Sequence, residues 1–98
     1  EGYIVSVNVG EIYYMICRKL NVKAAEAALT AIRQWPLVMV DADLKLCLEA
    51  AAIKAGHSLS YADAFSAAVT IQKKATLITG DKEFDSLMGV ANFKVKYI

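Results

Sequence analysis

Short apolar runs of strand length alternate along this chain with longer segments that have helical spacing, and this alternation limits the folds that are possible. The run Leu37–Val40 is continuously apolar, which is typical of a parallel strand covered on both faces. Between such runs, apolar residues recur at helical intervals, as Val9, Ile12 and Ile16 do. Strands that alternate with helices predict an α/β fold with right-handed crossovers and a mostly parallel sheet.

The pattern predicts where each strand and helix lies. Strands are expected at Tyr3–Ser6, Leu37–Val40, Thr76–Thr79 and Phe93–Ile98. Helices are expected to follow the capping residues Ser6, Asn21, Asp41 and Ser60, with a further short helix between Asp81 and Met88.

Composition indicates one soluble domain over residues 1–98. Of the 98 residues, 57% are hydrophobic and 21% are charged, whereas disordered chains are poorer in apolar groups. The apolar runs are far shorter than the roughly 20 residues that cross a bilayer, so no membrane partner is expected. The net charge of +1 neither requires nor excludes nucleic acid. Cys17 and Cys47 lack the close spacing of a zinc site and no secretory signal is visible, which favours reduced thiols and a cytoplasmic location.

Three acidic residues stand where strands give way to helices. Asp81 directly follows the strand at Thr76–Thr79, Glu11 lies less than two helical turns beyond the strand at Tyr3, and Asp63 lies in the first turn of a helix. In open α/β sheets the ligand crevice lies beyond the carboxyl ends of the strands. Carboxylates gathered at that edge are suited to hard divalent cations such as Mg²⁺ or Mn²⁺.

Each acid also has a purely structural explanation. Asp63 has capping-box spacing from Ser60, and Asp81 can cap the short helix that follows it. Glu11 is harder to explain in this way, because its neighbours are mostly apolar and burial of an unpaired carboxylate is costly. The remaining acids are weaker candidates: Glu26, Glu49 and Glu83 fit solvent-facing helical positions, Asp41 and Asp43 fit caps, and Asp85 is a reserve candidate one turn beyond Asp81.

Nucleophilic catalysis and phosphate-loop chemistry find little support. The single histidine, His57, is expected to be an exposed loop residue, and no motif aims a serine or cysteine at it. The glycines are scattered and form no phosphate-binding loop.

Three segments together resemble the successive motifs of PIN-domain proteins. They are Ser6–Tyr14 (SVNVGEIYY), Leu59–Phe65 (LSYADAF) and Thr79–Phe84 (TGDKEF), in family order and at plausible separations. The similarity covers essentially the whole chain, and the last two motifs are the most specific.

This resemblance implies a three-layer α/β/α sandwich and a metal-dependent ribonuclease of the VapC type, the toxin of a toxin–antitoxin pair. Carried over residue by residue, it implies that Glu11, Asp63 and Asp81 are the catalytic and metal-binding residues for Mg²⁺ or Mn²⁺, and that Thr79 supports the site. The implied partners are an RNA substrate, an antitoxin protein and a second copy of the chain. No protein nucleophile is required, because metal-bound carboxylates can orient the attacking water.

The resemblance departs from the family at the start of the chain. PIN domains open with a strand that carries a first catalytic aspartate, followed by a helix, and that unit has no counterpart before Tyr3. The fold is therefore expected to be incomplete at its N-terminus, and the 98-residue chain to be weakly active or inactive. Two alternatives remain open: a non-catalytic PIN-like interaction module, in which the acids are caps, and, with less support, a phosphotransfer or phosphatase domain with Asp81 as nucleophile.

Overall fold

The structure consists of two compact units, which are described separately below. The computed structural model describes residues 2–97, so the Ile98 end of the last predicted strand lies outside the described residues. The N-terminal unit comprises Glu1–Asp41 and the C-terminal unit comprises Ala42–Ile98. Both combine helices with a pair of parallel strands, which confirms the predicted α/β fold.

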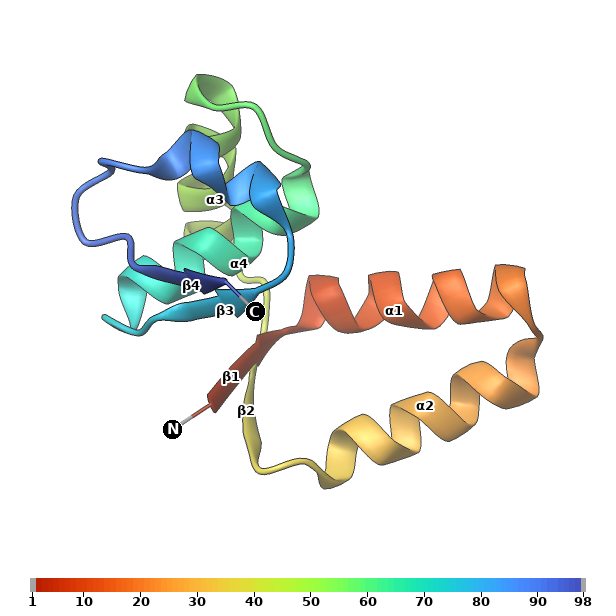
Figure 1. Ribbon diagram of the computed structural model, residues 1–98. Coiled ribbons are helices and arrows are strands. Elements are labelled where there is room, and N and C mark those ends of the chain that lie inside the picture. The colour runs from red at the N-terminus through yellow and green to blue at the C-terminus, as the bar shows by residue number, and fades with distance from the viewer. Residues whose placement is uncertain (1, 98) are drawn as a thin grey trace. The chain divides into compact units, whose positions relative to one another are not determined.

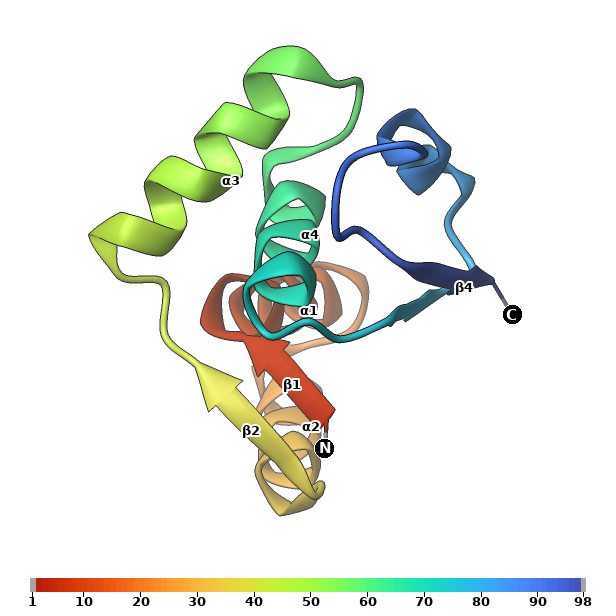
Figure 2. The same cartoon turned by 90° about the vertical axis from the view of Figure 1, so that its left-hand side faces the viewer.

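The N-terminal unit is a helical hairpin joined to a two-stranded sheet (Figure 1). Strand β1 (Gly2–Val5) pairs in parallel with β2 (Leu37–Val40), with Gly2 opposite Leu37; Figure 2 shows the two strands running in the same direction. Between them, helix α1 (Ser6–Lys19) packs against helix α2 (Val22–Gln34). The hairpin buries few side chains, namely Val9, Ala25 and Ile32.

A hydrogen bond links the two helices of this hairpin. The Tyr13 hydroxyl on α1 donates to Oε1 of Glu26 on α2 over 2.7 Å. This bond raises the pKa of Tyr13, because loss of the phenolic proton would leave two negative oxygens in contact.

The C-terminal unit has a larger core. Helix α3 (Leu44–Gly56) packs against helix α4 (Tyr61–Gln72), and α4 contacts strand β3 (Leu77–Thr79). A short 3₁₀ helix, η1 (Lys82–Leu87), follows, and strand β4 (Val95–Tyr97) pairs in parallel with β3. The buried apolar residues are Leu46, Ala50, Leu59, Ala64, Phe65, Ala67, Ala68, Val69, Phe84 and Leu87.

The helix starts test the capping residues that the sequence predicted. Two predicted caps are confirmed: Asn21 Oδ1 accepts from Ala24 N over 2.7 Å, and Ser60 Oγ accepts from Asp63 N over 3.1 Å. Two are wrong. Helix α3 does not start at Asp41: it is capped by Asp43, which the sequence also offered as a cap, because Asp43 Oδ1 accepts from Leu46 N over 2.9 Å.

The second correction concerns the first helix, which starts at Ser6, directly after strand β1. Val5 occupies the capping position of α1 and makes no side-chain cap bond. The strand therefore passes into the helix without an intervening loop.

The strands form two pairs, β1 with β2 and β3 with β4, and each pair is parallel. This confirms the mostly parallel character predicted from the continuous apolar runs. That residues 1–98 act as a single domain stays a prediction. Within residues 2–97, no helix is long and apolar enough to span a membrane.

Candidate metal centre

Asp63 lies in the first turn of α4, where two features of the sequence fix its position. Ser60 caps the helix through the backbone N–H of Asp63 itself. The next two residues, Ala64 and Phe65, are buried and hold the helix against the core. A carboxylate in this turn is also stabilised by the helix dipole.

Asp81 lies at the junction between strand β3 and η1. Its backbone N–H donates to Thr79 Oγ1 over 3.0 Å, and its own Oδ1 accepts from Glu83 N over 2.8 Å. The Thr79 hydroxyl therefore shapes the turn that presents Asp81. Asp81 is exposed and also serves as the cap of η1, as its structural explanation predicted.

A third carboxylate, that of Glu83, joins these two. One carboxylate oxygen from each of Asp63, Asp81 and Glu83 can be chosen so that all three lie within 4.8 Å of one another. Oxygen ligands lie 2.0–2.1 Å from Mg²⁺ and 2.3–2.6 Å from Ca²⁺, so the oxygens around one such ion are at most about 4–5 Å apart. The carboxylate cluster, defined as Asp63, Asp81 and Glu83, could therefore hold a hard divalent cation, and carboxylate oxygens are ligands that suit Mg²⁺ and Mn²⁺.

The close approach of these acids has an electrostatic consequence. A hydrogen bond with the Asp63 side chain, together with the negative charge of Asp81, raises the pKa of Glu83, while Lys54 on α3 partly opposes the shift.

Glu83 was missed at the sequence level because it fits a solvent-facing helical position. It is indeed exposed, but η1 is a 3₁₀ helix that starts with a bond from Glu83 N to Asp81. The sequence did contain a signal for Glu83: it lies two residues after Asp81, directly beyond a strand, in Asp81-Lys82-Glu83.

The structure brings Asp63 and Asp81 together, as predicted. Glu11 lies half-buried on α1 in the N-terminal unit, and its assignment to the same site stays a prediction. The reserve candidate Asp85 is engaged elsewhere, because its Oδ1 accepts the Tyr97 hydroxyl proton over 2.5 Å. This bond raises the pKa of Tyr97 to about 12.

The histidine and the two cysteines, which the sequence also offered for consideration, are found in structural roles. His57 does lie in the α3–α4 loop, but it is half-buried rather than exposed, with Nδ1 2.9 Å from the Ser86 carbonyl oxygen. Cys17 and Cys47 are free and half-buried.

Comparison with known proteins identifies the family. The model of the PIN domain matches residues 1–89. This chain belongs to the PIN domain family. The resemblance carried by its three motifs is thereby confirmed, whereas a search of curated proteins found no match.

Solved structures support the same fold for this PIN domain. It is similar to the DNA-bound VapBC from Salmonella typhimurium, with 17% identity and a TM-score of 0.75 over 97% of this chain and 74% of that one. It is also similar to VapBC2 from Rickettsia felis bound to a DNA fragment from their promoter, with 18% identity and a TM-score of 0.70 over 97% and 73% of the two chains. At these identities the likeness bears on the fold of the PIN domain alone.

Proposed function

We propose that this chain is a metal-dependent ribonuclease of the PIN-domain type, with weak activity of its own, that hydrolyses RNA phosphodiesters with Mg²⁺ or Mn²⁺ held by its acidic residues. The convergence of the Asp63, Asp81 and Glu83 carboxylates is the observation that carries this proposal. PIN domains are generally nucleases and typically use a divalent metal, which supports the same assignment.

The acidic side chains would supply the metal ligands. Asp81 is held by its bonds to Thr79 and Glu83, and Asp63 by the cap of α4, so both carboxylates are preorganised. A bound divalent cation would lower the pKa of a coordinated water and offset the charge that develops on the phosphate. By the family resemblance, Glu11 is proposed as a further ligand.

We further propose an antitoxin partner, self-association and a cytoplasmic role, as expected of a VapC-like toxin. The similarity to VapBC structures supports the antitoxin partner. The N-terminal hairpin offers apolar surface for such contacts, including an open, shallow hollow on α1 lined by Ile12, Met15, Ile16, Lys19 and Leu20.

RNA cleavage tests the proposal. We expect Mn²⁺-dependent cleavage of single-stranded RNA that stops with EDTA, measured with the protein in excess so that slow turnover is also detected. Asp81→Asn should reduce the rate by about 100-fold or more, the order of effect seen when one group that stabilises a transition state is lost. Asp41→Asn, at an exposed acid in the N-terminal unit, is the matched control and should cleave normally.

Two results would count against a nuclease. Undiminished cleavage by Asp81→Asn would remove Asp81 from the mechanism. Absence of saturable Mn²⁺ binding by the folded chain would favour the non-catalytic interaction module instead.

A further inference from the structure

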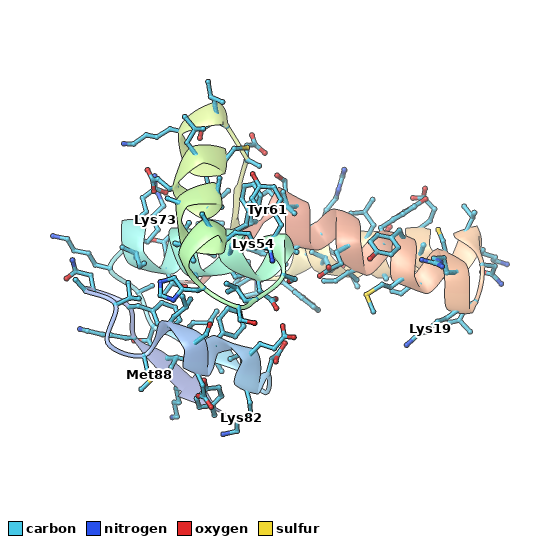
Figure 3. The ribbon with its side chains drawn as sticks, turned by 90° about the horizontal axis from the view of Figure 1, so that it is seen from above. Lys19, Lys54, Tyr61, Lys73, Lys82 and Met88 are labelled. Carbon is cyan, nitrogen blue, oxygen red and sulfur yellow. The ribbon has the colours of Figure 1, made fainter. Side chains whose placement is uncertain are left out.

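The lysine that follows Asp81 of the carboxylate cluster in the sequence is held in place by an aromatic ring. Lys82 follows Asp81 in η1, and its Nζ lies 4.0 Å from the centroid of the Tyr97 ring on β4. Figure 3 shows Lys82 near the start of η1, and Lys54 on α3 in the same unit. A cation at this distance from a ring face is attracted by the ring quadrupole.

The ring itself is fixed by a second contact. The Tyr97 hydroxyl donates to Asp85 Oδ1 over 2.5 Å, and Asp85 lies three residues after Lys82 in η1. Asp85, Tyr97 and Lys82 thus form a connected series from the end of β4 back to the residue next to Asp81. The charge of Asp81 also contributes to the raised pKa of Tyr97, which places Tyr97 within electrostatic range of the cluster.

This arrangement suits the binding of an anion. Free lysine side chains lose conformational freedom when they bind a ligand, and a side chain that is already ordered loses less. The ring occupies one side of the Lys82 ammonium, and N–H donors that point away from the ring can bind oxygen.

The carboxylate cluster creates the need for such a cation. Three acids within 4.8 Å repel a polyanionic strand on every side that a bound metal does not neutralise. The nearby cation Lys54 already interacts with the cluster. Its charge lowers the pKa of Glu83, although the other, larger effects raise that pKa. Lys82 is held by the neutral Tyr97 ring.

We propose that Lys82 binds a non-bridging phosphate oxygen of the RNA strand, at a phosphate other than the one positioned at the carboxylate cluster. Tyr97 and Asp85 are positioning residues that hold Lys82 for this contact. The contact reads the backbone and not the bases, so it is independent of RNA sequence. The inference rests on the proposed ribonuclease function and names how its substrate strand is held.

Binding of RNA at several salt concentrations tests this role. The probe is a fluorescein-labelled single-stranded RNA of 12 nucleotides, with Ca²⁺ in the buffer and anisotropy as the readout. Lys82→Ala should weaken binding about twofold to fivefold, as expected for one exposed charge pair. The slope of log K against log salt should fall in magnitude by about 0.7, the value for one lost contact to a single strand. Lys82→Arg should keep the slope.

Lys45→Ala is the matched control. Lys45 is an exposed lysine of the same unit, about 14 Å along α3 from Lys54 at nine residues of helical rise. The Lys45→Ala variant should leave both the RNA affinity and the salt slope unchanged. Tyr97→Leu removes the ring that holds Lys82 and should weaken binding by less than Lys82→Ala does, with the charge still present.

The outcomes separate this proposal from the proposed function. An unchanged salt slope in Lys82→Ala would overturn it, even if the variant melts at a lower temperature, because Lys82 would then only tie η1 to β4. Failure of the wild-type chain to bind RNA would also overturn it. Lys82-dependent RNA binding by a chain that does not bind Mn²⁺ would contradict the ribonuclease and leave the phosphate contact standing.

Discussion

The two units of this protein contrast in what their helices bury. In the C-terminal unit, α4 buries half of its twelve residues, namely Ala64, Phe65, Ala67, Ala68, Val69 and Thr70. In the N-terminal unit, α1 buries only Val9, and α2 buries Ala25 and Ile32. The large exposed apolar side chains of the hairpin include Tyr14, Met15, Leu20 and Val22.

This difference shows why the carboxylate cluster lies in the C-terminal unit. Asp63 is followed by buried Ala64, and Glu83 is followed by buried Phe84, so each acid stands on a segment that the core holds. Side chains on rigid elements keep a metal site in register better than those on mobile ones. The N-terminal hairpin, with its exposed apolar side chains, is better suited to binding a partner.

Truncation of a core leucine should give the largest effect on stability. Leu46 on α3 is 1% exposed, and Leu46→Ala should lower the free energy of unfolding by about 2–5 kcal/mol, because it removes buried methyl groups and leaves a cavity. Urea denaturation followed by circular dichroism measures it.

The hairpin supplies the matched comparison. Leu20 is 71% exposed, so Leu20→Ala should change the free energy of unfolding by no more than about 0.5 kcal/mol. Equal losses of unfolding free energy in Leu46→Ala and Leu20→Ala would contradict the difference in burial between the two units.

A smaller effect is expected from pH through Glu83. Its pKa is raised in the folded chain, so the protonated carboxyl contributes stability below its ordinary value of 4.5, and this contribution is lost as the pH rises through the raised pKa. In EDTA, Glu83→Gln should therefore become more stable relative to the wild type between pH 4 and pH 7. Melting temperatures across that range measure the trend.

A difference in melting temperature between wild type and Glu83→Gln that stays the same at every pH would contradict this account. Glu83 would then titrate in the folded chain as it does in the unfolded one. Asp41→Asn is again the control, and it should show no such trend relative to the wild type.

Much of the fold followed from the sequence because its signals are local. The apolar run Leu37–Val40 and the caps Asn21 and Ser60 depend on neighbours within a few residues, and each is found where it was predicted. Asp41 was assigned as a cap wrongly, since two aspartates separated by one residue both satisfy the helix-start pattern and only the backbone path selects Asp43.

The site was predicted less completely because it depends on contacts between elements. Asp63 and Asp81 come from α4 and from the end of β3, and the order of the motifs predicted their meeting. Glu83 was left out because helical periodicity does not distinguish an α-helix from a 3₁₀ turn in so short a segment. The Lys82–Tyr97 contact joins residues 15 positions apart, η1 to β4, and no local pattern indicated it.

Calorimetric titration of the 98-residue chain with Mn²⁺ tests the central claim, that the carboxylates of Asp63, Asp81 and Glu83 form a metal site. The account predicts saturable binding in the wild type and in Asp41→Asn, and affinity reduced at least about tenfold in Asp81→Asn and in Glu83→Gln, since even supporting groups around a metal contribute on this scale. Absence of Mn²⁺ binding in the folded wild type, or unchanged affinity in both site variants, would contradict it.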